Sequence, residues 1–173
     1  MDKLTEKVET LNRVSKLLKE NGDNDPIETW NSMGLFNPWY VINEKNNIIK
    51  FSWREAFSME NVCVVVIWDK NYEHCKLLYS DTRIYNDSIK TMELNKNDII
   101  KLEKYLYEKD YFNYKKIEDC IQIDGSHSEL EIKINNKYNV ENDFNCINNL
   151  LLYDFATILF ELAKEKPGNI LGS

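Results

Sequence analysis

The segment between Ser128 and Val140 constrains the fold more than any other part of the sequence. Its first half, SELEIKI, alternates apolar and charged residues, which is the pattern of a β-strand with one apolar and one charged face. Asn135-Asn136 follows and suits a tight turn, because Asn tolerates positive φ better than most residues. The chain then returns through Val140. We therefore predict a β-hairpin whose apolar face needs a covering element.

Three segments have the apolar spacing of amphipathic helices. They run from Asp2 to Asn21, from Asn95 to Glu108, and from Cys146 to Glu165. Asn95 can cap the second helix through its side-chain oxygen. The inward stripe of that helix is expected to be Ile99, Leu102 and Leu106. Pro167-Gly168 ends the third helix, and residues 169–173 are expected to fray.

Further strand signals lie between the first two helices. Trp39–Ile42 and Ile48–Trp53 flank a polar loop and predict a second hairpin. Val62–Trp68 is β-branched and almost wholly apolar, which predicts a central strand covered on both faces. His74–Ser80 is expected to pair with it, and Ile89–Leu94 is expected to hold one more strand.

Together these elements predict an α+β fold. We expect an antiparallel, twisted sheet of about five to seven strands. The N-terminal, middle and C-terminal helices are expected to pack mainly on one face, leaving the opposite face partly open. We expect residues 1–173 to form a single domain, in which 1–45 are a helical extension and 46–166 hold the sheet and two helices.

Composition and charge exclude some classes of function. A net charge of -7 argues against a general nucleic-acid binder and against docking on anionic lipid, while it suits a basic protein partner. The N-terminus lacks the apolar core of a signal peptide, and the longest apolar run is too short to span a bilayer. The four cysteines include no C-x-x-C pair. We therefore expect a cytoplasmic protein with reduced cysteines.

The sequence shows no clear catalytic, cofactor or metal constellation. The five glycines lack the spacing of phosphate-binding loops. His74 and Cys75 are adjacent, and on a strand they would point to opposite faces, so they cannot easily share one ion. His127 between Ser126 and Ser128 is interpreted as a turn residue, since a catalytic triad is recognised only by spatial geometry. We therefore predict a protein that is not an enzyme, with no cofactor and no metal site.

Carboxylates are concentrated between Glu118 and Asp143, where seven acids stand against two lysines. Glu129 and Glu131 share the outward face of the predicted strand, and an open strand face rarely provides the concave site that a pair of catalytic acids needs. The acids then either form a solvated face or dock a basic partner and steer its association. The candidate partner-binding residues are Asp124, Glu129, Glu131, Glu141 and Asp143.

Two other functions stay open at this point. Aromatic residues gather between Trp30 and Phe57, and if they lined a concave cavity the chain would be a small-molecule-binding or enzymatic domain. Core packing is the other interpretation of that cluster. The apolar stripe of the first helix, which includes Leu4 and Leu18, either mediates self-association or docks on its own domain. We expect a monomer or a weak homodimer.

Several short motifs follow one another along the chain in an order that is similar to that of a known group of proteins. Phe51-Ser52-Trp53-Arg54 ends a strand, the apolar strand Val62–Trp68 follows, and Leu94-Asn95 begins a helix. The aromatic pair Tyr111-Phe112 then precedes a hairpin that starts with Asp124–Glu131. From about residue 48 to residue 165 this order resembles a group of small, largely uncharacterised bacterial proteins with a D-G-x-x-W-x-L-E hairpin. Ser128 stands where the pattern of that group has Trp.

The resemblance implies a function without catalysis. Some members of the group are similar to immunity proteins, which bind a cognate toxin. It therefore implies non-catalytic binding of a toxin. Together with the excess of acids in the hairpin, this predicts an immunity or antitoxin-type protein that masks the active site of a basic toxin, for example a nuclease, with the acidic hairpin face. The first 45 residues are outside the resemblance.

Overall fold

The computed structural model describes residues 3–22, 46–55, 60–84, 89–113, 126–144 and 150–171. The chain divides into two compact units, Met1–Lys45 and Asn46–Ser173, and each is described by itself. In the first unit, helix α1 spans Lys3–Glu20, which confirms the predicted N-terminal helix. Gly22 follows with φ of 80°, a conformation that costs glycine no Cβ clash and so ends the helix.

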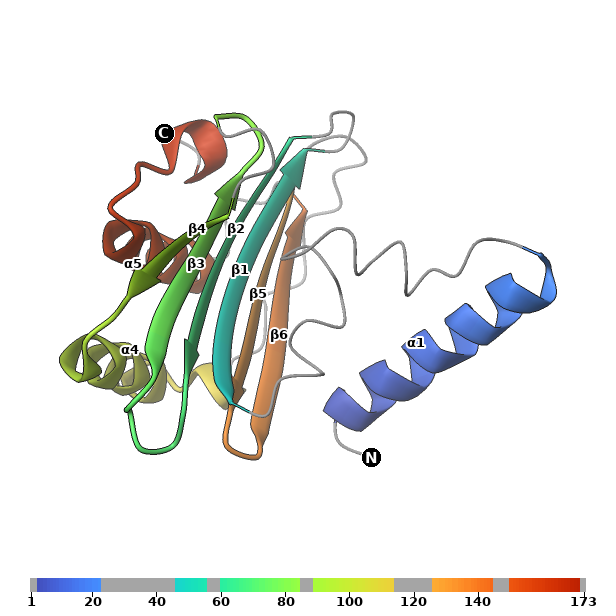
Figure 1. Cartoon of the computed structure of the whole chain (residues 1–173), viewed down its shortest axis with the longest axis horizontal. Coiled ribbons are helices and arrows are strands. Elements are labelled where there is room, and N and C mark those ends of the chain that lie inside the picture. The colour runs from blue at the N-terminus through green and yellow to red at the C-terminus, as the bar shows by residue number, and fades with distance from the viewer. Residues whose placement is uncertain are drawn as a thin grey trace. The chain divides into compact units, whose positions relative to one another are not determined.

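The described part of the second unit is organised around a six-stranded antiparallel sheet with the order β4-β3-β2-β1-β5-β6 (Figure 1). Its strands are β1 (Asn47–Glu55), β2 (Asn61–Trp68), β3 (Cys75–Asp81), β4 (Lys90–Glu93), β5 (Ser126–Ile134) and β6 (Lys137–Phe144). This confirms the predicted α+β class and the expected strand number. The sheet is open, and β4 and β6 form its edges. The strand predicted at Trp39–Ile42 lies outside the described residues. Its predicted hairpin with Ile48–Trp53 is wrong, because β1 pairs with β2 on one side and with β5 on the other.

Strand β2 occupies the interior position that its composition predicts. It lies between β1 and β3, and every residue from Val62 to Trp68 is buried. A strand without an outward polar residue must be covered on both faces, because exposing either would leave apolar side chains in water. The neighbouring strand β1 is also buried from Asn47 to Phe51, although this stretch includes the polar residues Asn47 and Lys50.

Strands β5 and β6 form the predicted hairpin. Ile134 pairs with Lys137 across the turn, and Asn135 has φ of 54° there. The backbone N–H of Asn135 donates to the side-chain oxygen of Asn47 at 2.8 Å, which ties the turn to the start of β1. The hairpin therefore joins the rest of the sheet through β1.

Helices α4 (Lys96–Glu108) and α5 (Leu150–Ala163) lie on the same face of the sheet (Figure 1). Helix α4 begins at the predicted cap, where Oδ1 of Asn95 accepts a hydrogen bond from the backbone N–H of Asp98 at 3.0 Å. Its buried residues are Ile99, Leu102 and Leu106, as predicted. Helix α1 was also predicted to pack on this face. Because α1 belongs to the other unit, that packing stays a prediction.

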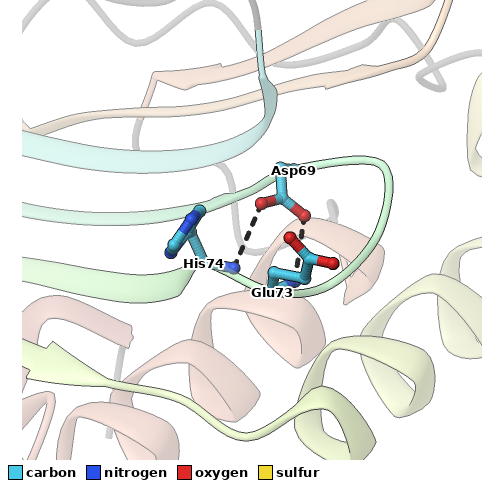
Figure 2. A group of neighbouring side chains, drawn as sticks. All are labelled: Asp69, Glu73 and His74. Atoms are coloured by element: carbon cyan, nitrogen blue, oxygen red, sulfur yellow. Dashed lines mark hydrogen bonds between the residues drawn. The ribbon is translucent and has the colours of Figure 1, made fainter.

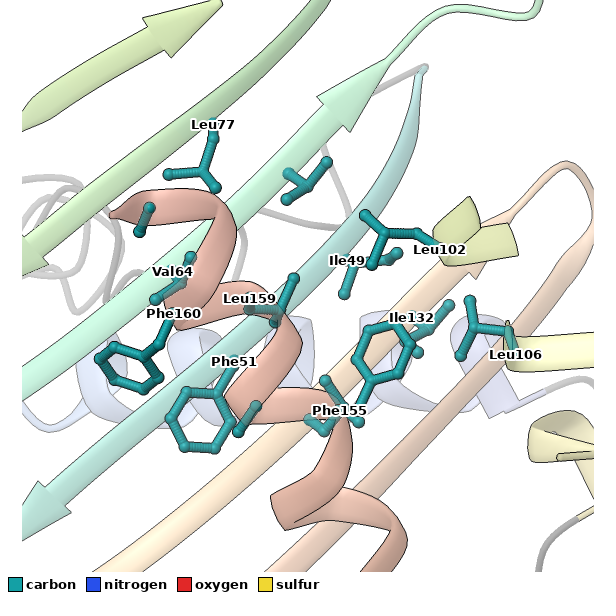
Figure 3. Packing of buried hydrophobic residues seen from close by; sticks show 14 of the residues in the cluster. Ile49, Phe51, Val64, Leu77, Leu102, Leu106, Ile132, Phe155, Leu159 and Phe160 are labelled. Carbon is teal, nitrogen blue, oxygen red and sulfur yellow. The ribbon is translucent and has the colours of Figure 1, made fainter. Parts of the chain in front are cut away.

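The core lies between the two helices and the sheet (Figure 3). The ring of Phe160 contacts those of Phe51 and Tyr79 edge to face, with centroid distances of 6.0 and 6.1 Å. The buried stripe of α5 is Leu151, Leu152, Phe155, Ala156, Leu159, Phe160 and Ala163. Phe155 and Leu159 belong to the buried cluster, whereas Leu162 is only partly buried. Because α5 is apolar over much of its surface, its sequence alone does not locate the inward stripe.

The expectation that residues 169–173 fray is wrong for Ile170. Ile170, in the short 3-10 helix η3 (Gly168–Leu171), is 4% exposed and packs in the core, so this part of the C-terminus is not frayed. The sheet face opposite α4 and α5 is not open at its centre, where Ile48, Val65 and Ile67 are buried.

Replacing Phe160 with alanine should destabilise the fold by about 3–5 kcal/mol, because it removes a fully buried ring and leaves a cavity. Urea unfolding followed by circular dichroism measures the change. The control is Ile100→Ala on the exposed side of α4, which should change stability by less than about 0.5 kcal/mol. Equal effects of the two substitutions would contradict the packing described for α5.

Candidate functional site

The acids predicted to share one exposed hairpin surface lie on both faces of the sheet. Glu129 and Glu131 alternate with core residues of β5 and so face away from the helices. Glu141 pairs directly with Leu130, which places it on the helix-covered face. Glu131 is fully buried and Glu141 is 7% exposed, whereas Glu129 is half-buried. The prediction of a solvated acidic face is therefore wrong for Glu131 and Glu141.

The other two predicted residues are less fully described. Asp124 lies outside the described residues. Asp143 belongs to β6, where its backbone is in register with Ser128. Of the five predicted partner-binding acids, Glu129 is the one whose side chain is described as partly accessible.

Glu131 belongs to a buried ion pair. Lys50 of β1 is in register with Glu131 of β5, and its Nζ lies 3.8 Å from Oε2 of the carboxylate. The Tyr138 hydroxyl donates a hydrogen bond to Oε1 of the same group. Burial and the neighbouring Glu131 charge raise the pKa of Tyr138 well above its ordinary value. The hydroxyl thus stays protonated and keeps its hydrogen bond to Glu131.

Cys63 lies beside this ion pair and is also buried. Burial raises the pKa of its thiol to about 12, although Lys50 opposes part of that effect. The nucleophilic form of cysteine is the thiolate, so Cys63 is unreactive in the folded protein. This agrees with the sequence-based interpretation of a buried thiol.

Glu141 takes part in a second buried polar cluster, on the helix-covered face. The side-chain amide of Asn139 donates to Oε1 of Glu141 at 3.3 Å and to the carbonyl of Tyr111 at 3.1 Å. The Tyr111 hydroxyl in turn donates to the Leu130 carbonyl at 3.0 Å. These bonds attach the 3-10 helix η2 (Tyr111–Asn113) to the hairpin, so the role of the cluster is structural.

A third polar cluster, missed in the sequence, closes the end of β3. The fully buried Asp81 accepts hydrogen bonds from Nε and Nη2 of Arg83 at 3.0 and 2.7 Å, and from the Tyr79 hydroxyl at 3.0 Å. The guanidinium also lies 5.5 Å from the ring centroid of Trp53. Burial raises the pKa of Asp81, but the hydrogen bonds from Arg83 and Tyr79 outweigh it and leave that pKa below its ordinary value.

The geometry gives no support to a hydrolytic site around His127. That residue lies within β5 in register with Arg54, so the expected turn is wrong. Adjacent strand residues point to opposite faces, which turns His127 away from Ser126 and Ser128. Ser128 is also only 2% exposed.

The early aromatic residues that the structure describes are core residues. Phe51 is fully buried and Trp53 is 7% exposed, both within the main apolar cluster. Trp30, Phe36, Trp39, Tyr40 and Phe57 lie outside the described residues. The aromatic pocket hypothesis therefore stays a prediction.

A surface groove lies beside the edge strand β4, where the start of α4 and the end of α5 meet it. It has a volume of about 500 Å³. Its described lining, here called the β4 groove, is Met92, Glu93, Leu94, Asn95, Asp98, Glu161, Leu162 and Lys164. The lining thus contains three carboxylates, one lysine and three apolar side chains. The sequence did not indicate this concentration of acids, because Glu93, Asp98 and Glu161 come from three separate elements.

A second group of polar side chains lies in the turn between β2 and β3 (Figure 2). Asp69, Glu73 and His74 bring one potential ligand atom each to within 4.8 Å of one another. The Asp69 carboxylate accepts hydrogen bonds from the backbone N–H groups of Asn71, Glu73 and His74. Bonding to the Glu73 N–H is the main cause that lowers the pKa of Asp69. Sequence reasoning missed this group because it compared His74 with Cys75 and not with the preceding acids.

No protein-family model matches this sequence, and a search of curated proteins gives no match either. Among the described residues, no helix has both the length and the apolar character needed to cross a membrane. The resemblance to the bacterial group therefore stays a prediction.

Replacing Lys50 with methionine should destabilise the protein by about 3–5 kcal/mol, because it leaves the Glu131 carboxylate buried without its cation. Urea unfolding measures the loss. The double variant Lys50→Met/Glu131→Gln removes both charges and keeps an acceptor for Tyr138, so it should recover more than about 1 kcal/mol of that loss. A single variant as stable as the wild type would contradict the burial of this pair.

Asp81 should make the free energy of unfolding depend on pH in the acidic range. Its pKa in the folded state is lowered from the ordinary value of 3.8, so its contribution is present above that pH and is lost as the pH falls through the folded value. Unfolding free energies measured from about pH 6 to about pH 2 should show a shallower acid loss in Asp81→Asn than in the wild type. Glu55→Gln, at an exposed position, is the control and should follow the wild-type profile.

Proposed function

We propose that this chain is a non-catalytic protein-binding domain that takes a basic segment of another protein into the β4 groove. The observation that carries this proposal is the lining of the groove, which combines the carboxylates Glu93, Asp98 and Glu161 with apolar side chains. The net charge of -7 agrees with a basic partner. Complementary charge of this kind speeds encounter and fixes orientation more than it supplies raw affinity.

The apolar residues of the lining support a partner segment that carries both basic and apolar side chains. Met92, Leu94 and Leu162 are half-buried, so a partner could cover their remaining apolar area. The C-terminal end of α5 lies at the same groove, and the last carbonyls of a helix carry partial negative charge. A segment with lysine or arginine next to apolar residues fits both features.

The edge position of β4 supports an extended partner. Among the described strands β4 pairs only with β3, so its outer backbone groups face away from the sheet. Extended peptides commonly bind by adding a strand to such an edge. We propose this arrangement in place of the hairpin surface, since Glu131 and Glu141 are buried.

We further propose that the partner is a toxin and that the domain acts as an immunity or antitoxin-type protein. A protein that binds nucleic acid needs a basic substrate surface, and an acid-lined groove is complementary to one. A nuclease would therefore be a suitable target. This part of the proposal rests on the resemblance described above.

The test compares three baits in a pull-down from a lysate of the source organism at low salt. The baits are the wild type, the groove variant Glu93→Lys/Glu161→Lys, and the control Glu55→Lys, which reverses an exposed charge on β1. A basic protein should be retained by the wild type and the control. Its affinity for the groove variant should be at least about tenfold lower, and the difference should shrink in about 0.5 M salt because ions screen exposed charges.

Equal retention of the same protein by all three baits would contradict the groove as the binding surface. Retention of an acidic protein, or of none, would contradict the proposed partner class. Circular dichroism of each bait checks that the reversed charges leave the fold intact, as expected for exposed positions.

A further inference from the structure

We infer that the turn between β2 and β3 binds a divalent transition-metal ion through Asp69, Glu73 and His74. The inference is independent of the proposed function, because none of these residues lines the β4 groove. It rests on the convergence of two carboxylates and one imidazole in six consecutive residues.

The distances suit an ion without rearrangement of the backbone. Ligand atoms of the three side chains all lie within 4.8 Å of one another. Around an ion with bonds of about 2.0–2.2 Å, neighbouring ligand atoms are separated by about 3–4 Å. Rotation of the exposed Glu73 and His74 side chains is therefore enough to bring the three groups onto one ion.

Asp69 is already held in place for this role. Its carboxylate accepts three backbone hydrogen bonds, two of 3.0 Å and one of 3.2 Å. A carboxylate has about four acceptor positions, so one of them is left for a cation. The turn itself is anchored to α4, where the Tyr72 hydroxyl donates to Glu103 at 2.7 Å.

The other two groups have no competing partner in the part of the chain that the structure describes. Neither the Glu73 carboxylate nor the His74 imidazole forms a hydrogen bond or ion pair there, and Figure 2 shows both beside Asp69. The three side-chain hydrogen bonds described above for the backbone of this turn are all accepted by the Asp69 carboxylate. Placing a second carboxylate next to it brings two like charges together, which a bound cation would offset.

The donor set indicates the kind of ion. Magnesium and calcium prefer sites made of oxygen atoms alone, whereas imidazole is a usual ligand of zinc, cobalt and nickel. Three protein ligands leave coordination positions open, and the exposure of the turn lets water fill them. Cys75 follows His74 but packs into the core at 3% exposure, so it is not a ligand here.

The test is titration of the full-length, reduced protein with Zn²⁺ by calorimetry, and with Co²⁺ by visible absorption. We compare the wild type with Glu73→Gln/His74→Ala, which changes only exposed side chains and leaves the Asp69 turn intact. The matched control is His127→Ala, which removes the other histidine. Mg²⁺ serves as the hard-cation control.

We expect one Zn²⁺ per chain in the wild type and in the control, and at least about tenfold weaker binding in the double variant. The Co²⁺ spectrum should lack thiolate charge-transfer absorption, since no cysteine takes part. Unchanged affinity in the double variant, a thiolate signature that persists in it, or preference for Mg²⁺ would each overturn the inference. Absence of Zn²⁺ binding to the wild type would overturn it as well.

Discussion

The second unit depends on the pairing of β1 with β5, two strands that lie far apart in the sequence. Strand β1 pairs with β2 on one side and with β5 on the other, so it joins the first four strands to the hairpin. The Lys50–Glu131 ion pair lies on this register. A slip of one residue would move Glu131 to the core face and Leu130 away from it, and both changes are costly. One buried charge pair thus disfavours a shifted register of β1 against β5, the pairing through which the two parts of the sheet are joined.

The elements with a clear period could be predicted from the sequence. The α4 stripe, its Asn95 cap and the Asn135 turn all follow from local chemistry, and each is found in the structure. The exposure of a strand face could not be predicted in the same way. Alternation shows that Glu129 and Glu131 share a face, but whether that face meets water depends on residues distant in sequence. Charge therefore suggested solvation for Glu131, whereas its burial is compensated by Lys50 from another strand.

The candidate sites also differ in whether their residues are neighbours in the sequence or are brought together by the fold. Counting acids along the chain favoured the hairpin, because such a count includes only sequence neighbours. The β4 groove draws its acids from β4, α4 and α5, and only tertiary structure brings them together. Asp69, Glu73 and His74 lie within one turn, so their spacing was accessible to sequence reasoning. What the sequence could not supply there was the backbone geometry that brings ligand atoms of the three side chains to within 4.8 Å of one another.

The short length of β4 has a consequence for the proposed recognition of a partner. With only four residues, Lys90–Glu93, this edge can offer an added strand very few backbone hydrogen bonds. Backbone bonds are the same for every sequence, so a long edge would accept many different segments. A short one leaves discrimination to the side chains of the groove, most of which lie outside the core. Under the proposed toxin-binding function, such residues can change in step with the toxin while the sheet beneath them stays the same.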